Sequence, residues 1–213
     1  MTLSLVVLIS GNGSNLQSII DAIEAGRLKA KIDLVISNNP HAYGLERATR
    51  HNIPSLIIDH RQFQRAELFD AEVARELEYL NPDYILLAGF MRILGSALVH
   101  QFTGRMLNIH PSLLPRYKGL NTYQRALDNQ ELYHGVSIHL VTAELDGGPV
   151  ILQGSYSIDS GETAEDLQRK GSALEHQMYP QLLCWLSEGK ITVAGDQIFH
   201  DQVLLDAPIQ FGI

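Results

Sequence analysis

Short hydrophobic runs alternate with amphipathic segments along the first half of the chain. The runs have the nearly continuous Leu, Val and Ile content of strands buried in a parallel sheet. The segments between them carry apolar residues at helical spacing. We therefore expect strands at 3–10, 31–37, 55–58, 84–88 and 105–110, and helices at 16–25, 43–51, 65–80 and 94–102. This alternation predicts an α/β fold with a doubly wound, mostly parallel, Rossmann-like sheet.

The pattern changes after Pro115. We expect a short helix at 122–128, strands at 135–142 and 150–158, and a long C-terminal helix from 163 to about 187. Thr163 can cap that helix, because its hydroxyl can accept a hydrogen bond from a free N–H of the first turn. Segments 191–193 and 198–204 can pair as a terminal hairpin. The later part of the sheet is therefore expected to be antiparallel.

The chain shows no internal repeat, low-complexity stretch or linker. Its 213 residues suffice for one substantial core. We expect one domain over residues 1–189, with two halves that meet at about 104–105. A tail at 190–213 follows, with a possible hairpin.

Charge and composition narrow the class of function. A formal net charge of −8 disfavours a non-specific grip on nucleic acid, which needs a basic face. Cys184 is the only cysteine, so no intrachain disulfide can form. No hydrophobic run approaches the roughly 18 residues of a membrane span, and the N-terminus lacks the features of a signal peptide. We expect a cytoplasmic protein with no membrane or nucleic-acid partner.

The first candidate for chemistry lies at the end of the strand at 105–110. Asn108 and His110 are two residues apart, so their side chains point the same way on a strand. Pro111 and Pro115 stop the strand, because proline lacks a backbone donor. Ligands of open α/β sheets bind at the carboxyl ends of strands. An amide and an imidazole are thus presented at the ligand-binding edge.

The second candidate is Asp146, which is followed by two glycines that allow close backbone approach. Asparagine, histidine and aspartate together can do acid–base work on a carbonyl group. A carboxylate beside His110 would also keep the imidazole protonated near neutral pH. Asp146 can also be explained as a residue that simply starts a turn, since Asp-Gly is a common turn pair. His139, on a nearby predicted strand, is more simply explained as structural.

The third candidate is the turn Ser-Gly-Asn-Gly-Ser-Asn at 10–15, between the first strand and the first helix. Free N–H groups of Gly13, Ser14 and Asn15 can hold a single phosphate there, although a plain tight turn explains the segment equally well. The turn is not a dinucleotide fingerprint, because Leu16 occupies the third glycine position. A nicotinamide cofactor is therefore disfavoured. The dispersed histidines and single cysteine predict no metal site.

Together these residues resemble the glycinamide ribonucleotide formyltransferases, a family of folate-dependent enzymes of purine synthesis. The resemblance runs from Leu5 to about Leu186 and is carried by the blocks at 7–17, 87–94, 107–115 and 144–150. The last two blocks are shared by formyltransferases in general. The Ser-Gly-x-Gly-Ser-Asn loop is the discriminating block, because it suits a phosphorylated small substrate.

The resemblance implies transfer of the formyl group of 10-formyltetrahydrofolate to the amine of N1-(5-phosphoribosyl)glycinamide, in de novo purine (IMP) biosynthesis. It implies a phosphate-binding half at 1–104 and a catalytic and folate-binding half at 105–189. The implied catalytic residues are Asn108, His110 and Asp146, and the implied substrate-binding residues are Gly13, Ser14, Asn15 and Glu175. Ser172 is three residues before Glu175 on the predicted helix, so it shares that face and is a further candidate for contact with the substrate. The implied folate pocket contains Arg65, Met91, Arg92, Ile93, Leu94, Asn108, Thr142, Ala143, Glu144, Leu145 and Asp146. Arg65 reaches its position only if one residue is inserted nearby.

By this reading the amine attacks the formyl carbon directly, with no metal and no covalent enzyme intermediate. Asn108 and protonated His110 stabilise the oxyanion, and Asp146 keeps His110 protonated. The partners are small molecules, and the chain is a monomer or homodimer. Two alternatives stay open: a formyltetrahydrofolate hydrolase, which uses water in place of the amine, and a non-catalytic module that binds a phospho-sugar. The hydrolase would be expected to carry an additional N-terminal module, whereas the first strand here starts at Leu3.

Overall fold

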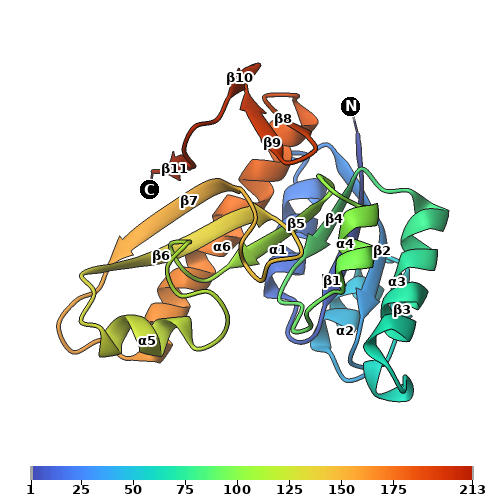
Figure 1. Cartoon of the computed structure of the whole chain (residues 1–213), viewed down its shortest axis with the longest axis horizontal. Coiled ribbons are helices and arrows are strands. Elements are labelled where there is room, and N and C mark those ends of the chain that lie inside the picture. The colour runs from blue at the N-terminus through green and yellow to red at the C-terminus, as the bar shows by residue number, and fades with distance from the viewer. Residues whose placement is uncertain (1, 213) are drawn as a thin grey trace.

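The protein is built around one large mixed sheet, seen in a computed structural model that describes residues 2–212 (Figure 1). Its strands are β1 (Leu3–Ile9), β2 (Ala30–Ser37), β3 (Ser55–Ile57), β4 (Tyr84–Leu87), β5 (Met106–His110), β6 (Tyr133–Leu140), β7 (Val150–Ser157) and β11 (Ile209–Phe211). Their order across the sheet is β11-β7-β6-β5-β4-β1-β2-β3. Strands β1 to β5 are parallel, and β6 is antiparallel to both β5 and β7.

Helices cover both faces of the sheet, as the alternating pattern predicts. They are α1 (Ser14–Glu24), α2 (Tyr43–Arg50), α3 (Ala66–Leu80), α4 (Ser96–Gln101), α5 (Thr122–Asp128) and α6 (Ala164–Ser187). Alternate residues of β1 enter two separate cores: Leu5 and Val7 pack with α1 and α6, whereas Val6 and Leu8 pack with α3 and α4. Thr163 caps α6, as expected, and its hydroxyl accepts a hydrogen bond from the Asp166 N–H. The doubly wound, mostly parallel fold is confirmed.

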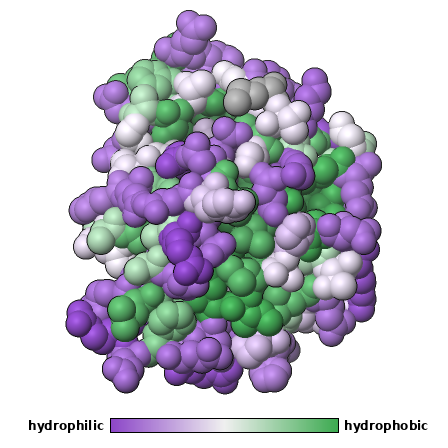
Figure 2. Space-filling view, turned by 90° about the vertical axis from the view of Figure 1, so that its right-hand side faces the viewer, coloured by the Kyte–Doolittle hydropathy of each residue, from purple (hydrophilic) through white to green (hydrophobic). Residues whose placement is uncertain are grey.

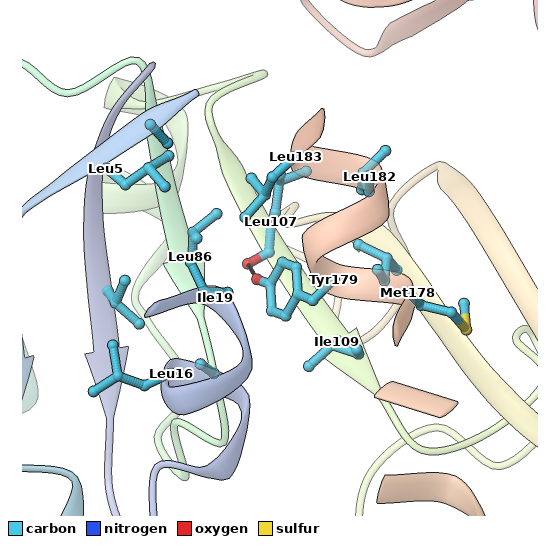
Figure 3. Packing of buried hydrophobic residues seen from close by; sticks show 14 of the residues in the cluster. Leu5, Leu16, Ile19, Leu86, Leu107, Ile109, Met178, Tyr179, Leu182 and Leu183 are labelled. Atoms are coloured by element: carbon cyan, nitrogen blue, oxygen red, sulfur yellow. Dashed lines mark hydrogen bonds between the residues drawn. The ribbon is translucent and has the colours of Figure 1, made fainter. Parts of the chain in front are cut away.

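A buried tyrosine joins α6 to the middle of the sheet (Figure 3). The ring of Tyr179 is fully buried among apolar side chains that include Ile19 and Leu183. Its hydroxyl lies 3.0 Å from the carbonyl oxygen of Leu107 and 3.3 Å from that of Leu87. These carbonyls belong to the neighbouring strands β5 and β4. The single phenolic proton therefore stays satisfied where water is excluded.

The C-terminal segment differs in detail from the expected hairpin. Strands β8 (Ile191–Ala194) and β9 (Gln197–His200) pair across Gly195-Asp196, and β10 (Val203–Leu204) adds a third antiparallel strand. The expected strand at 198–204 is interrupted because Asp201 and Gln202 adopt left-handed backbone angles, with φ of 47° and 68°. After β10 the chain returns to the main sheet, where β11 pairs in parallel with β7. The strand β11 was not predicted from the sequence.

Within residues 2–212, no helix combines the length and the apolar character needed to cross a membrane. Figure 2 shows the side of the molecule that α3 covers, where apolar surface gathers in the lower half between polar residues. The large apolar side chains that are exposed on α3 and on the segment after β4 include Leu68, Met91 and Ile93.

The hydrogen bond of the Tyr179 hydroxyl should make a measurable contribution to the free energy of unfolding. Replacing Tyr179 by Phe keeps the ring but removes the hydroxyl, so the free energy of unfolding should fall by about 1 kcal/mol. Chemical denaturation followed by the fluorescence of Trp185, the one tryptophan, measures this change. Tyr79→Phe, at a site that is 85% exposed, is the matched control and should change stability by less than about 0.5 kcal/mol. Equal effects of the two substitutions would contradict the assigned bond.

Candidate active site

The pairing of β5 with β6 assembles the centre of the site. Asn108 of β5 lies opposite His139 of β6 in the antiparallel register, so their side chains emerge on the same face. The Asn108 amide nitrogen lies 3.1 Å from Nε2 of His139. His139 Nδ1 lies 2.8 Å from the carbonyl oxygen of Leu140, to which only an N–H can donate. Nδ1 therefore carries a proton, and in neutral His139 the Nε2 accepts from Asn108.

Asp146 reaches this centre from the loop that joins β6 to β7. Its backbone is left-handed, with φ of 46°. Gly148, two residues later, passes so close to the end of β6 that a Cβ there would lie 1.9 Å from the carbonyl oxygen of Leu140. Only glycine fits at that position. The Asp-Gly-Gly sequence therefore supplies the tight return that points the carboxylate at β5.

The Asp146 carboxylate collects polar groups from three segments. The N–H of Gly119 donates to Oδ2 at 2.9 Å, and the Asn108 amide donates to Oδ1 at 3.4 Å. Two imidazoles lie slightly further away: His110 Nδ1 is 3.5 Å from Oδ2, and His139 Nε2 is 3.6 Å from Oδ1. Burial raises the pKa of Asp146, but the contact with His139, the Gly119 hydrogen bond and the nearby imidazoles together lower it below its usual value. The carboxylate is therefore ionised at neutral pH.

His110 is close to Asp146, as expected, but it is buried behind the site. Its Nε2 donates to the carbonyl oxygen of Tyr117 at 2.9 Å, which leaves Nδ1 facing Asp146. Burial lowers the pKa of His110 by more than Tyr117 and Asp146 raise it. In the free protein, burial therefore opposes the protonation of His110 that Asp146 is expected to favour. The loss of hydration outweighs a carboxylate that is 3.5 Å away.

A cleft opens beside these groups, and nine residues of the expected folate pocket line it: Arg92, Ile93, Leu94, Asn108, Thr142, Ala143, Glu144, Leu145 and Asp146. Leu87, Phe90, His139 and Val141 complete the lining. The lining thus combines apolar side chains with an amide, an imidazole and a carboxylate. His110 does not line the cleft. Asp146, whose Oδ2 is 3.5 Å from His110 Nδ1, does line it.

Two residues of the expected folate pocket lie outside the cleft. Arg65 precedes α3 on the surface, where it forms an exposed ion pair with Glu67 at 3.3 Å. The side chain of Met91 is 70% exposed, and only its backbone N–H is bonded, to the Ser10 hydroxyl at 2.8 Å. Arg92 does line the cleft, with its guanidinium 4.7 Å from the centre of the Phe69 ring.

The turn at 10–15 forms an open helix N-terminus. Gly13 precedes α1 with a φ of 72°, and no side chain caps the helix. The first hydrogen bond of the helix runs from Gln17 N–H to Gly13 O, so within residues 2–212 the N–H groups of Ser14, Asn15 and Leu16 have no protein acceptor. Three free donors at the positive end of a helix form an anion site. Since β1 and β5 are parallel, this site and Asn108 share one edge of the sheet.

The structure also brings α6 to this turn. The Asn15 amide donates to Oε2 of Glu175 at 2.7 Å, and the Asn15 oxygen is buried with no partner among the described residues. Burial raises the pKa of Glu175 by more than this hydrogen bond lowers it. Ser172, one helical turn earlier, is half-buried on α6. Glu175 is thus in contact with the turn, while no polar contact of the Ser172 hydroxyl is found within residues 2–212.

Within residues 2–212, no group of three His, Cys, Asp or Glu side chains is arranged to hold a metal ion. The site instead combines an open helix N-terminus, an apolar cleft and a buried Asn-His-Asp cluster. The sequence model of the formyl transferase family matches residues 3–183. A phosphoribosylglycinamide formyltransferase of Escherichia coli K12 is 46% identical over 189 residues, which cover 89% of each chain. The chain belongs to the formyl transferase family.

Other relatives of this formyl transferase agree with that placement. The trifunctional purine biosynthetic protein adenosine-3 of Homo sapiens is 40% identical over 185 residues, which are 87% of this chain and 18% of that protein. A solved phosphoribosylglycinamide formyltransferase from Coxiella burnetii, in complex with CHES, superposes with a TM-score of 0.94 at 47% identity over the whole of both chains. Glycinamide ribonucleotide transformylase 1 from Symbiobacterium toebii gives a TM-score of 0.89 at 39% identity, covering 93% and 94% of the two chains.

Three groups of the formyl transferase site were missed from the sequence. His139 was interpreted as structural, yet it lines the cleft and contacts Asn108 and Asp146. Its cross-strand position is visible only once the β5–β6 register is known. The other two groups are the backbone N–H of Gly119 and the backbone carbonyl of Tyr117. Backbone groups in a loop leave no residue-type signal in a sequence.

A third buried histidine lies next to this site. His134 is 1% exposed, and the rings of Tyr117, Tyr123 and Tyr156 surround it with centroids 5.4 to 6.2 Å away. Its Nε2 is buried without a hydrogen-bond partner among the described residues. Burial is the main cause that lowers the pKa of His134, and the nearby His110 adds to the effect.

This lowered pKa predicts a pH-dependent stability. Below the unfolded pKa, near 6.5, the unfolded chain binds the proton of this imidazole more readily than the folded protein. Stability from His134 is thus present above that pKa and is lost as the pH falls towards the folded value. The free energy of unfolding should fall more between pH 7.5 and 5.5 in the wild type than in His134→Gln. Denaturant titrations at both pH values measure the difference, and an unchanged pH slope in the variant would refute the assignment.

Proposed function

We propose that this formyl transferase moves the formyl group of 10-formyltetrahydrofolate to the amine of N1-(5-phosphoribosyl)glycinamide. The observation that carries the proposal is the placement of an anion site and an Asn-His-Asp cluster at the same edge of the parallel sheet. A substrate with a phosphate at one end and a nucleophilic amine at the other suits that placement. The named relatives act in purine biosynthesis, which agrees with this substrate.

The phosphate of the substrate would bind the free N–H groups of Ser14 and Asn15 at the start of α1. Its ribose hydroxyls would meet Glu175, whose Oε2 already accepts a hydrogen bond from Asn15. Gly13 lets this turn pack closely against the start of α2, because a Cβ there would lie 2.8 Å from the Cα of Gly44. Phosphate recognition thus depends on backbone groups, and the acidic net charge of the chain does not oppose it.

The folate would bind in the cleft. A pterin ring is flat, apolar on its faces and rich in donors and acceptors at its edge. The side chains of Leu87, Phe90 and Val141 offer the apolar contact, and the backbone of residues 142–146 offers edge partners. The formyl group would then lie beside Asn108 and Asp146. The folate is consumed as a co-substrate, and the proposed reaction uses no metal.

In the proposed reaction the amine attacks the formyl carbon and gives a tetrahedral intermediate with a negative oxygen. The Asn108 amide can turn one N–H towards that oxygen, because it currently shares its two hydrogens between His139 and Asp146. A preorganised donor of this kind contributes about 10²- to 10³-fold in rate. The ionised Asp146 accepts the proton that the attacking amine loses, directly or through a water. The proton then passes to the folate nitrogen as the C–N bond breaks.

His110 would serve this reaction from behind Asp146. In the free protein its Nδ1 faces the carboxylate and its Nε2 is bonded to Tyr117. When Asp146 takes up a proton, Nδ1 of His110 can accept that proton and later return it to the carboxylate. Donation from His110 to the oxyanion would require this side chain to reach the cleft, whose lining does not include it here.

The alternatives make different demands on the site. A hydrolase would release formate from the folate without the amine, and a binding module would have no use for a buried carboxylate next to an amide and two imidazoles. Keeping Asp146 buried and ionised costs free energy. A module that only binds phosphate would gain nothing from such a carboxylate. The buried cluster therefore favours an enzyme over a binding module, and the anion site at the start of α1, which a hydrolase would not need, favours the transferase.

The proposal is tested by following the absorbance of released tetrahydrofolate. Purified protein is mixed with 10-formyltetrahydrofolate, with and without N1-(5-phosphoribosyl)glycinamide. We expect release only when the amine is present, and a loss of at least about 10²-fold in kcat for Asp146→Asn, with little change in ligand affinity. Glu165→Gln, an exposed carboxylate in the first turn of α6, is the matched control and should behave as wild type.

Each other outcome contradicts the proposal. Release without the amine would identify a hydrolase, and no release under either condition would identify a binding module. Near-normal turnover in Asp146→Asn would remove Asp146 from the chemistry even if formyl transfer were observed.

A further inference from the structure

The hydrogen bond that orients His110 comes from a loop residue. Tyr117 lies in the segment between β5 and α5, and its carbonyl oxygen accepts from His110 Nε2 at 2.9 Å. Its backbone is left-handed, with φ of 55°. An isolated tyrosine disfavours this conformation. The surrounding structure must therefore hold Tyr117 in place.

Two hydrogen bonds and a cation–π contact fix the side chain of Tyr117. Its hydroxyl donates to Oε1 of Glu131 at 2.7 Å and accepts from the Asn129 amide at 3.1 Å. The Arg125 guanidinium lies 5.2 Å from the centre of its ring. Glu131 is itself fixed, because Arg116 Nη1 donates to both of its oxygens at 2.9 Å. These contacts tie the ring to the segment that follows α5, outside the cleft.

The same loop also fixes the carboxylate. Two residues after Tyr117, the N–H of Gly119 donates to Oδ2 of Asp146 at 2.9 Å. Between them, the carbonyl oxygen of Lys118 accepts from Arg125 at 2.7 Å, and the Lys118 amine pairs with Glu144 at 2.7 Å. Three consecutive residues thus hold His110, the neighbouring loop and Asp146. A shift of the Tyr117 ring would disturb both members of the His110–Asp146 pair.

We propose that Tyr117, anchored through its hydroxyl to Glu131, is a positioning residue that sets the tautomer and orientation of His110. The inference rests on the proposed function for its consequence in catalysis. With the proton fixed on Nε2 by the Tyr117 carbonyl, Nδ1 is the nitrogen available to Asp146. Neither Tyr117 nor Glu131 lines the cleft, so their effect on the reaction passes through His110 and, by way of the Gly119 N–H, through Asp146.

Four charged or titratable groups face His110 and bear on any measurement of its protonation. They are Asp146 on the loop after β6, His139 and His134 on β6, and Arg125 on α5. The test variants leave all four unchanged. A change in the state of His110 can therefore be assigned to the loss of the Tyr117 anchor.

The test compares Tyr117→Phe and Glu131→Gln with Tyr133→Phe. Tyr117→Phe removes only the anchoring hydroxyl, and Glu131→Gln keeps an acceptor at a reduced charge. Tyr133→Phe makes the same chemical change at a largely exposed position on β6 and is the matched control. Thermal unfolding of each variant verifies that it is folded. The readouts are kcat and KM for formyl transfer and the ¹⁵N shifts of the His110 ring, which report its tautomer.

We expect Tyr117→Phe to lower kcat by about 5- to 10-fold, the equivalent of one lost hydrogen bond, with KM for both substrates changed by less than about 2-fold. The His110 ring should shift from the Nε2–H tautomer towards a mixture. Glu131→Gln should have the same effects, but smaller, and Tyr133→Phe should have none.

An unchanged kcat, or an unchanged His110 tautomer, in folded Tyr117→Phe would overturn the positioning role. The ring measurement also separates this inference from the proposed function. If the wild type transfers no formyl group, the proposed function fails, whereas the tautomer still reports whether Tyr117 orients His110.

Discussion

A carboxylate that is nearly buried must be surrounded by donors, and this requirement at Asp146 organises the site. An unpaired buried charge costs several kcal/mol. The side chain of Asp146 is 9% exposed, yet it receives the Gly119 N–H and the Asn108 amide and faces two imidazoles. These partners come from β5, β6 and the loop before α5. Three separate segments must therefore meet before the carboxylate can stay ionised, and that meeting also creates the cleft.

These segments come together where the sheet changes from parallel pairing, between β4 and β5, to antiparallel pairing, between β5 and β6. The parallel strands β1, β4 and β5 bring the helix N-terminus at Gly13 and the side chain of Asn108 to one edge. The antiparallel strand β6 then sets His139 beside Asn108 and returns the chain for the Asp146 loop. Tyr179 of α6 holds β4 and β5 together below the site. The phosphate-binding and acid–base features are thus parts of one sheet edge.

Much of this could be predicted from residue patterns, because the buried strands and amphipathic helices carry strong periodic signals. Asn108, His110 and Asp146 also stood out, through their positions at a strand end and at an Asp-Gly-Gly turn. The burial that lowers the pKa of His110 could not be predicted, since it depends on packing that no local pattern reveals. The role of His139 needed the β5–β6 register. The pairing of β11 depends on the path of the whole C-terminal segment. The strand itself has only three residues, which is too short for a periodic signal.

In the proposed reaction, Asn108 and Asp146 act as one unit on the same reacting group. The most direct test is a double-mutant cycle on kcat for formyl transfer, with Asn108→Ala, Asp146→Asn and the combined variant. Groups that act together should give strongly non-additive effects, so the double variant should lose little more than the worse single variant. Additive losses, with the two free-energy changes summing in the double variant, would contradict the account.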